Sequence, residues 1–294
     1  MTEYLMQYIN KNKNIIDKEL ESYIGALNIP SNLKDSMLYS LQAGGKRLRP
    51  LLLLASYEAY SENYAKALAP AVALEMVHTY SLIHDDLPAM DDDDYRRGKL
   101  TNHKAFDEAT AILAGDALLT YSFDVIANNS LLNDTEKVNI ISLLSQCSGP
   151  KGMVGGQILD MEAEDKQITL GQLERIHELK TGELLKFAVY AGAYLAEASN
   201  SQLDALKQFA YALGLIFQIQ DDILDITGDE EKLGKRVGSD ESNEKSTYPK
   251  LLGLEGAMRK KDEYVIIAKS ALHKANAEES YLMALTDYFS NREY

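Results

Sequence analysis

Apolar residues recur at three- and four-residue steps along most of the chain, which is the period of an amphipathic α-helix. Two of these series are especially regular, one between residues 70 and 87 and the other between residues 206 and 223. Their apolar positions are Val72, Met76, Tyr80, Ile83 and Leu87 in the first, and Leu206, Phe209, Leu213, Ile216 and Ile223 in the second. No alternating pattern long enough for a strand is found. The pattern therefore predicts an all-α protein.

Few residues interrupt these helical patterns. The 294 residues include only six prolines and 18 glycines, and no linker or low-complexity tract divides them. With 46% hydrophobic residues, the sequence predicts one domain spanning residues 1–294. The polar segment from Gly228 to Pro249 is the exception, and we expect it to be a long loop that closes over a site.

Two aspartate clusters lie at the C-terminal ends of the two regular helices. The helix macrodipole is negative there, so helix stability does not explain the acids. Two carboxylates about 4 Å apart repel by roughly 4 kcal/mol at an effective dielectric constant near 20. A divalent cation relieves that repulsion, and carboxylates without Cys or His favour Mg²⁺, which binds few carboxylates together with water and substrate phosphates. The clusters are Asp85, Asp86 and Asp91, and Asp221, Asp222 and Asp225.

The spacing of the second cluster suits a continuous helix. Asp221 and Asp225 lie one turn apart on one face, with Asp222 beside them and Gln218 one turn earlier. We expect these four oxygen-bearing side chains to share one patch. Each cluster taken singly is also compatible with an ordinary solvated acidic face.

The first cluster does not suit a continuous helix. Pro88 disfavours helix beyond Leu87, so Asp91 must return through a bent segment. If the helix ran on unbroken, Asp92 would align better with Asp85.

Basic residues that could hold a phosphate occur near the acidic clusters. One group is the segment Gly44-Gly45-Lys46-Arg47-Leu48-Arg49-Pro50, in which the glycine pair predicts a turn and three cationic residues follow it. A second group is Arg96 and Arg97, which follow the first acidic run. Arginine suits bidentate phosphate contacts. No GxxxxGK[ST] motif is present, so a nucleotide-binding P-loop is not indicated. Any one of these cations taken alone is compatible with an exposed surface position.

Further candidates are spread along the chain. His78 lies seven residues before Asp85 and faces the same way, two turns deeper, whereas His84 could hydrogen-bond locally. The remaining polar candidates are Lys180, Thr181, Lys235 and Lys245.

The charge balance limits the possible partners. A formal net charge of −15 argues against nucleic-acid binding. The single cysteine, Cys147, excludes an internal disulfide framework, suits a reducing compartment and is expected to be a small buried residue. The N-terminus has no signal-like apolar core, and the strongest apolar run, Leu51 to Ala55, is far shorter than a membrane span. We therefore expect a cytoplasmic protein without stable membrane insertion.

An ordered series of motifs resembles the trans-isoprenyl diphosphate synthases, specifically the bacterial farnesyl diphosphate synthases. The series covers roughly residues 40 to 255. The resemblance implies an all-α single-domain bundle of about ten or more helices around a deep central cavity, with an aspartate-rich motif on each side of its mouth. It also implies a homodimer. The motifs are GGKRLRP, HTYSLIHDDLPAMDDDDYRRG, AGDALL, GGQILD, LKTGELL, FQIQDDILD and GSDESNEKSTYP.

The resemblance also implies roles for individual residues. The six aspartates would hold about three Mg²⁺ ions on an allylic diphosphate. Residues matching the allylic-site and catalytic positions are Arg96, Lys180, Thr181, Gln218 and Lys235, with Asp85, Asp86, Asp91 and Asp221 among the catalytic residues and Lys245 as a weaker substrate contact. Residues matching the isopentenyl diphosphate site are Lys46, Arg49, His78 and Arg97.

The implied reaction condenses isopentenyl diphosphate with dimethylallyl or geranyl diphosphate. The allylic C–O bond ionises, the isopentenyl double bond attacks the carbocation, and a proton is lost, with the released diphosphate as a plausible base. Lys180, Thr181 and Gln218 would add charge and dipoles near the cation. Tyr80 lies about 7.5 Å below Asp85 along the helix axis, with Ser81 beside it. In this family an aromatic residue there is associated with short products, which favours C15 farnesyl diphosphate.

Other assignments remain open from the sequence. A geranylgeranyl diphosphate synthase would share the site with a deeper pocket, and a regulatory family member or an acidic ion-binding protein would be non-catalytic. A head-to-head synthase or terpene cyclase does not predict the GGKRLRP set. The chain also departs from members that end in a basic tail, because Arg292 precedes an acid, so closure of the isopentenyl site by the tail is doubtful.

Overall fold

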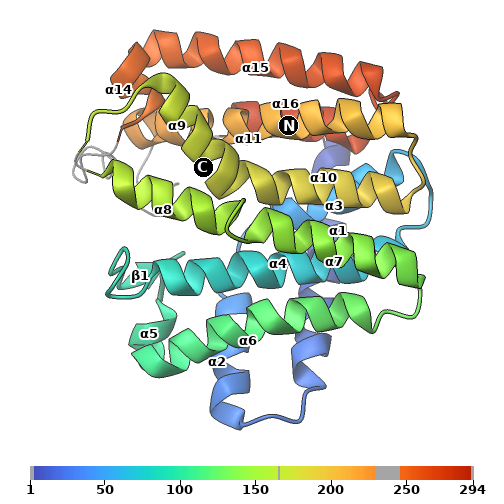
Figure 1. The fold of residues 1–294 in the computed structure, drawn as a ribbon, viewed down its shortest axis with the longest axis vertical. Helices are drawn as coiled ribbons and strands as arrows, with labels where there is room; N and C mark the ends of the chain where they lie inside the picture. The colour runs from blue at the N-terminus through green and yellow to red at the C-terminus, as the bar shows by residue number, and fades with distance from the viewer. Residues whose placement is uncertain (1–2, 165, 229–245, 293–294) are drawn as a thin grey trace. The chain divides into compact units, whose positions relative to one another are not determined.

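The computed structural model describes residues 3–164, 166–228 and 246–292. Helices form nearly all of its regular structure, so the prediction of an all-α fold is confirmed (Figure 1). The chain divides into two compact units. The first unit comprises Thr2–Leu54 and Tyr64–Ile141, and the second comprises Ala55–Asn63 and Ser142–Tyr294. The assignment of a single domain stays a prediction, as does the deep central cavity.

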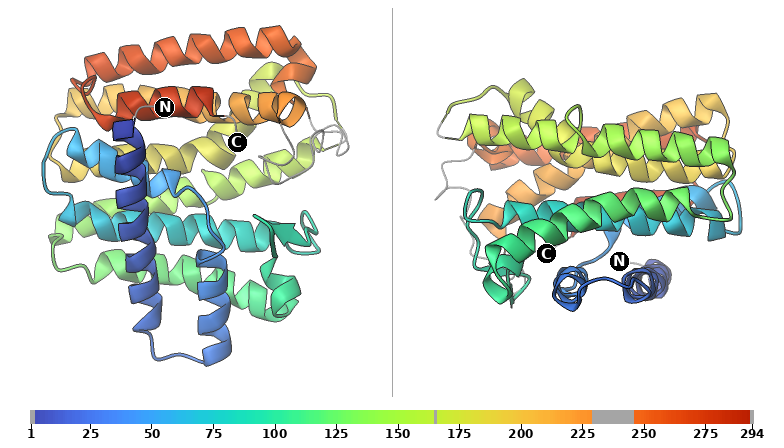
Figure 2. Two further views of the ribbon diagram at one scale, coloured as in Figure 1. Left: turned by 180° about the vertical axis from the view of Figure 1, so that it is seen from behind. Right: turned by 60° about the horizontal axis from the view of Figure 1, so that its bottom comes forward.

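The first unit contains the N-terminal helices and a small hairpin. Helices α4 and α6 run side by side (Figure 1), and α1 and α2 form a helical hairpin whose α1 crosses α4 (Figure 2). Its elements are α1 (Glu3–Gly25), α2 (Ser31–Leu41), most of α3 (Leu48–Glu58), α4 (Ala65–Asp85), β1 (Tyr95–Arg96), β2 (Lys99–Leu100), α5 (Asn102–Ala105), α6 (Glu108–Ala127) and the start of α7 (Asp134–Ser148).

The second unit is built around the long helix α11, against which α10, α15 and α16 pack (Figure 1). Its elements, besides the ends of α3 and α7, are α8 (Met153–Ala163), α9 (Leu170–His177), a π-helical turn η1 (Glu178–Gly182), α10 (Glu183–Leu195), α11 (Asn200–Thr227), α14 (Tyr248–Leu252), α15 (Leu254–Lys274) and α16 (Tyr281–Asn291).

Helix α4 differs in two ways from the predicted amphipathic stripe. It begins at Ala65, and Pro70 lies inside it rather than at its start. All five apolar positions of the stripe are buried, but so are residues on the other faces, including Ala71, Ala73 and Glu75. The stripe prediction is therefore wrong in its amphipathic character, because small alanines allow neighbouring elements to approach this helix from several sides.

Helix α11 follows the sequence prediction. The five apolar positions between residues 206 and 223 are all buried. Ser199 and Gln202 form a capping box at its N-terminus, which satisfies two backbone N–H groups. The helix ends at Thr227. Most of the segment predicted to be a long loop, residues 229–245, lies outside the described residues, and its end differs from the prediction because Thr247 caps α14, which has Pro249 in its first turn.

The hairpin between β1 and β2 was not predicted. Arg97 and Gly98 have φ values of 53° and 76° and connect strands of two residues each. Positive φ at both central residues is the requirement of a type I′ turn. Strands this short leave no alternating pattern in the sequence. The turn places Arg96 and Arg97 at fixed positions beside the end of α4.

Helix α6 is the one helix of the described residues that is long and apolar enough to cross a membrane. Its apolar window is 39% buried in the protein, and α6 packs along α4, so this finding is weak support for a span. Cys147 is a free, buried thiol whose burial raises its pKa, as expected of a packed apolar residue.

Candidate active site

The first aspartate cluster begins where α4 ends. Asp85 is the last residue of the helix, and the backbone N–H of Asp91 donates to the Asp85 carbonyl at 2.9 Å. Asp92 has a φ of 51°, so the chain turns there. The bent return of Asp91 is confirmed. The alternative of an unbroken helix that aligns Asp92 with Asp85 is wrong, as the restriction imposed by Pro88 explains.

Asp86 is buried and held by Arg96 of the hairpin. Arg96 donates from Nε and Nη2 to Oδ1 of Asp86 at 2.7 and 2.5 Å. Burial raises the pKa of Asp86, while the Arg96 guanidinium acts in the opposite direction. The structure thus brings two predicted site residues together, and both contacts of Arg96 with Asp86 use the same carboxylate oxygen.

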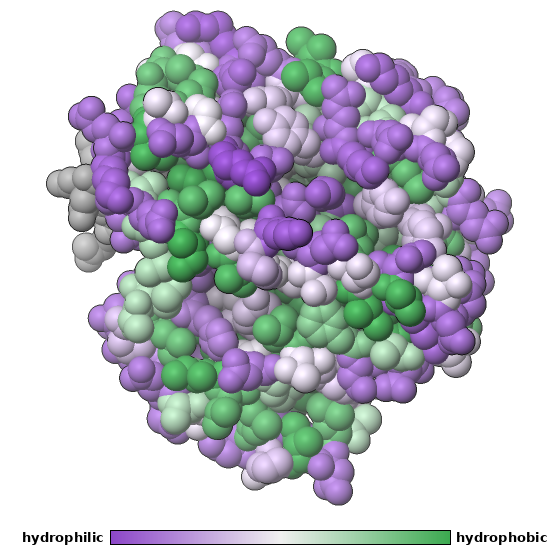
Figure 3. Space-filling view, viewed as in Figure 1, coloured by the Kyte–Doolittle hydropathy of each residue, from purple (hydrophilic) through white to green (hydrophobic). Residues whose placement is uncertain are grey.

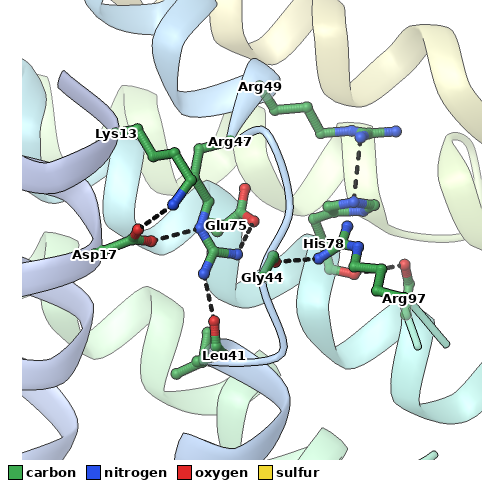
Figure 4. A network of polar contacts seen from close by, with 10 residues as sticks. Lys13, Asp17, Leu41, Gly44, Arg47, Arg49, Glu75, His78 and Arg97 are labelled. Atoms are coloured by element: carbon green, nitrogen blue, oxygen red, sulfur yellow. Dashed lines mark hydrogen bonds and ion pairs between the residues drawn. The ribbon is translucent and has the colours of Figure 1, made fainter. Parts of the chain in front are cut away.

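Arg47 has a different environment from the other cations of the Gly44–Pro50 segment (Figure 4). Its side chain is 3% exposed and donates to Asp17 of α1 and Glu75 of α4, both at 2.7 Å, and to the Leu41 carbonyl of α2. Arg47, one of the three cations of this segment that could have held phosphate, is therefore held by acids of its own chain. Its guanidinium instead ties the segment to three helices.

The predicted isopentenyl diphosphate residues lie close to this tie. Arg49 Nη1 lies 3.2 Å from His78 Nε2, and Arg97 donates to the Gly44 carbonyl (Figure 4). Burial lowers the pKa of His78 well below its ordinary value, and nearby arginines lower it further, beginning with Arg49. A neutral His78 accepts from Arg49, which leaves the cationic charge on the arginines. Lys46 lies partly buried in the same segment.

Gly45 explains how Arg97 reaches this segment. Its φ is +116°, and a Cβ at this position would overlap the Arg97 guanidinium. The positive φ is the reason that requires glycine here, because the Arg97 guanidinium is the end of a flexible side chain that could move aside.

Tyr80 is 6% exposed on α4, and its ring meets His84 edge to face with centroids 5.7 Å apart. Ser81 Oγ donates to the His78 carbonyl at 2.9 Å. His84 Nε2 lies 3.1 Å from the Ile112 carbonyl of α6. The suggestion of a local hydrogen bond for His84 is wrong, since its partner belongs to another helix. The chain-length roles of Tyr80 and Ser81 stay predictions.

A cavity of about 220 Å³ lies within the second unit, beside the end of α11. It is lined from α8, α9, η1, α11 and the residues just before α14, so three stretches of the chain, around residues 160–181, 218–222 and 246–247, meet at this cavity. Four predicted site residues are among its lining residues, namely Lys180, Thr181, Gln218 and Asp222.

The π-helical turn η1 delivers Lys180 and Thr181 to this cavity. Turns of this kind inside helices occur frequently at functional sites. Gly156 of α8 permits the arrangement, because a Cβ there would overlap the backbone of Leu179 and Lys180. Lys180 Nζ pairs with Asp160 of α8 at 2.6 Å.

Asp222 and Gln218 lie one turn apart on α11 and are both held from outside that helix. The Tyr248 backbone N–H donates to Asp222 Oδ2 at 2.9 Å. Gln218 Nε2 lies 3.4 Å from Nδ1 of His177, whose ring stacks on Tyr248 with centroids 5.9 Å apart and an interplanar angle of 15°.

Asp221 points to another partner. Arg292 donates from Nη2 to Asp221 Oδ1 at 2.5 Å and to the Phe217 carbonyl at 3.0 Å, and its guanidinium lies 4.0 Å from the centroid of the Phe217 ring. The expected single patch is therefore divided, because Asp221 pairs with the C-terminal segment while Gln218 and Asp222 line the cavity. Asp225 is buried, with 3% exposure.

Some predicted residues are not tested by this geometry, and others were missed. Lys235 and Lys245 lie outside the described residues. In the part of the chain that the structure describes, no three His, Cys, Asp or Glu side chains converge as a metal-binding group. Sequence reasoning missed Asp160, His177 and the contact of Arg292. Asp160 belongs to the GGQILD motif and His177 lies two residues before LKTGELL, so proximity to a motif was an available signal.

Comparisons with known proteins show which family the chain belongs to. Residues 30–287 match the family model described as polyprenyl synthetase. The chain is 50% identical over 296 residues to a farnesyl diphosphate synthase of Bacillus subtilis (strain 168), covering all of both chains. It is 44% identical over 290 residues to a geranylgeranyl diphosphate synthase of Cyanophora paradoxa, covering 98% of this chain and 96% of the relative.

A solved structure extends the likeness to the fold. The crystal structure of an FPP/GFPP synthase from Zymomonas mobilis superposes with a TM-score of 0.86 at 35% identity, covering 99% of this chain and 100% of that one. The family match spans most of the chain, and the identities extend over its full length. The protein belongs to the polyprenyl synthetase family.

Proposed function

We propose that the protein is a farnesyl diphosphate synthase that condenses isopentenyl diphosphate with dimethylallyl or geranyl diphosphate and releases diphosphate. The observation that carries the proposal is the 50% identity, over the full length of both chains, to a farnesyl diphosphate synthase. The cavity lined by Lys180, Thr181, Gln218 and Asp222 supports an allylic diphosphate site in the second unit. The cluster of Arg49, His78 and Arg97 supports an isopentenyl diphosphate site in the first.

The carboxylates fit Mg²⁺ as the metal. Both contacts of Asp86 with Arg96 use Oδ1, and Asp222 receives the Tyr248 N–H on Oδ2, so these buried acids are oriented by neighbours and use a single oxygen in each of those contacts. Mg²⁺ takes few protein ligands and completes its shell with water and phosphate, so a three-ligand cluster is not required. We propose that Asp85, Asp86 and Asp91, and Asp221, Asp222 and Asp225, bind about three ions through the diphosphate. When bound, the ions would neutralise charge on the departing diphosphate.

The protein's own cations would act on the same leaving group. Arg96 and Lys180 each hold a carboxylate in this structure, at 2.5 and 2.6 Å respectively. A diphosphate offers bidentate acceptors to the arginine and a charged acceptor oxygen to the lysine. We assign Arg96 and Lys180, together with Lys235 and Lys245 from the undescribed segment, to the allylic diphosphate, and Lys46, Arg49, His78 and Arg97 to isopentenyl diphosphate. Thr181 and Gln218 would direct their dipoles toward the allylic carbon as it becomes positive.

Product length depends on Tyr80. Its ring is buried on α4, about one and a half turns before Asp85, and packs edge to face against the ring of His84. A ring at this position would stop a growing isoprenoid tail, with Ser81 beside it, which supports a C15 product. Geranylgeranyl diphosphate synthesis is the second candidate, because a relative of that activity is 44% identical over nearly the whole chain.

The assembly and location of the protein extend the proposal. Helix α6 leaves Ile112 and Leu113 exposed at 39% and 59%, and Leu131 and Val138 are exposed near and on α7 (Figure 3 shows apolar surface over α6). An exposed apolar face of this kind supports a homodimer. The acidic net charge and the buried Cys147 thiol support a cytoplasmic protein, without nucleic-acid binding or stable membrane insertion. Sedimentation of wild type and Leu113→Lys would test the dimer.

The experiment for the activity is direct. Purified protein is incubated with labelled isopentenyl diphosphate, geranyl diphosphate and Mg²⁺, and the product is dephosphorylated and separated by chromatography. We expect farnesol, lost on addition of chelator and in Asp86→Asn and Asp222→Asn. Geranylgeraniol as the main product would favour the second candidate, and no extractable product would favour a non-catalytic family member.

A further inference from the structure

His177 is a cavity residue to which the reaction described above gives no role. It is the last residue of α9, directly before η1, and lines the same cavity as Lys180, Gln218 and Asp222. One ring nitrogen, Nδ1, lies 3.4 Å from Gln218 Nε2. The other, Nε2, is buried and has no hydrogen-bond partner among the residues that the structure describes.

The environment of His177 determines its charge. Burial lowers its pKa to about 4, and Lys180 acts in the same direction while Asp160 opposes it. The imidazole is therefore neutral near pH 7 and carries one proton. A neutral imidazole has one donor nitrogen and one acceptor nitrogen, so the contact made by Nδ1 decides which is which.

The contact with Gln218 selects one tautomer and one amide orientation. The amide nitrogen of Gln218 can only donate, so Nδ1 must accept and the proton must lie on Nε2. A carboxamide that turns its nitrogen toward His177 turns its oxygen the other way. With Gln218 in the cavity wall, that oxygen is the end of the amide left for a ligand.

The ring itself is fixed from its other side. Tyr248 stacks on it at an interplanar angle of 15°, and the backbone N–H of Tyr248 binds Asp222, one turn from Gln218. Contacts thus link Gln218 to His177, His177 to Tyr248 and Tyr248 to Asp222, while Asp222 and Gln218 lie on the same helix. Packing alone would be served by an apolar ring, without a buried nitrogen that lacks a partner.

We propose that His177 is a positioning residue for the allylic site, which holds the Gln218 carboxamide with its oxygen toward the carbon that becomes positive in the reaction. The chemical consequence of this inference rests on the proposed function. The contact between His177 and Gln218 is independent of that function. A carboxamide oxygen placed in this way stabilises positive charge, whereas the reversed amide presents its N–H groups and opposes it. The expected effect of losing the contact is on turnover rather than on isopentenyl diphosphate binding.

Steady-state kinetics test the role with three variants. His177→Phe keeps a stacking ring without the acceptor, and we expect kcat to fall about tenfold, the loss of one hydrogen bond in the transition state, with the KM for isopentenyl diphosphate unchanged. His177→Asn places an amide oxygen near the position of Nδ1 and should restore most of kcat. His273→Phe changes an exposed histidine and should behave as wild type.

A double-mutant cycle shows whether His177 acts through Gln218. In a Gln218→Leu background, His177→Phe should lower kcat by less than about twofold further, because the group to be positioned is gone. A full tenfold loss in both backgrounds, or His177→Asn no better than His177→Phe, would overturn the proposal.

Nitrogen-15 NMR of labelled histidine tests the contact without substrate. We expect the Nε2–H tautomer for His177 at pH 7, and a changed Nδ1 shift in Gln218→Leu. An Nδ1–H tautomer or a protonated ring overturns the inference. If wild type makes no prenyl product, the proposed function fails, while the tautomer still decides whether His177 holds Gln218.

Discussion

The tie made by Arg47 predicts a large cost when one of its acidic partners is removed. Glu75 and Arg47 side chains are each 3% exposed and 2.7 Å apart, whereas the second partner, Asp17, is 33% exposed. The substitution Glu75→Leu removes the buried acid and leaves the guanidinium in place with the solvent-screened one. Because Arg47 also donates to the Leu41 carbonyl, it remains fixed in the interior rather than turning to solvent.

The size of the effect follows from burial. Breaking a buried ion pair by removing one partner costs about 3–5 kcal/mol, and the remaining contact with Asp17 favours the lower end, about 3 kcal/mol. An unfolding entropy of about 2.1 cal/mol/K per residue over 294 residues gives roughly 0.6 kcal/mol/K, so the Tm should fall by about 5 °C. The KM for isopentenyl diphosphate should also rise, because the loosened segment carries Lys46 and Arg49.

Urea and thermal unfolding measure this cost, and two further variants identify its origin. The pair Arg47→Met and Glu75→Leu together removes both buried charges, and the double variant should be more stable than Glu75→Leu alone. Glu255→Leu removes an acid that is 93% exposed and should leave stability unchanged. A loss below about 1 kcal/mol in Glu75→Leu, or a double variant that is less stable than the single one, would refute the argument from burial.

Further expected outcomes concern the two site regions. Tyr80→Ala should lengthen the product beyond C15. Farnesol as the unchanged product in chromatography would show that the Tyr80 ring does not limit product length. Arg292→Gln releases Asp221, which is 39% exposed, so calorimetry without substrate should show Mg²⁺ binding up to about fivefold tighter, and unchanged or weaker binding would contradict competition. The folded-state pKa of His177, about 4, lies below its ordinary 6.5, so its stabilising effect is complete above pH 6.5 and lost as the pH falls toward 4. Wild type should therefore lose about 2 kcal/mol more than His177→Phe between pH 8 and 5, and parallel stability curves would refute this. The buried Cys147 thiol should react with a disulfide reagent only after unfolding, and rapid reaction of the native protein would contradict its burial.

The sequence predicted the helices because hydrophobic periodicity is a property of neighbouring residues. The apolar positions of α4 and α11 are buried as the three- and four-residue steps require, and Pro88 correctly indicated the bend before Asp91. The hairpin that carries Arg96 could not be predicted from hydrophobic periodicity, since strands of two residues have no period. The same limit applies to Glu75, whose burial opposite Arg47 depends on residues 28 positions apart.

Site residues were predictable where a motif carries them and unpredictable where a partner decides their role. Lys180, Thr181, Gln218 and Asp222 meet around one cavity, although η1 and α11 are separated by α10. Arg47 and Arg49 are two residues apart and read alike in the sequence, yet one ties three helices together and the other meets His78. Only the contacts in the structure distinguish an arginine that stabilises the fold from one that is a candidate to bind substrate.

The partners of the C-terminal arginine could not be predicted from its neighbours in the sequence. An acid follows Arg292, and closure of the isopentenyl site by the tail is not tested by the structure. In the structure its guanidinium is buried against the Phe217 ring and pairs with Asp221, as Arg96 pairs with Asp86 and Lys180 with Asp160. Each of these carboxylates thus has a cation of the chain itself within 2.6 Å. A divalent ion must displace such a partner to use the same oxygen, and a diphosphate then offers the displaced arginine or lysine a new acceptor. Metal and diphosphate should therefore bind more tightly together than either does alone, which calorimetry with Mg²⁺, with diphosphate and with both will decide.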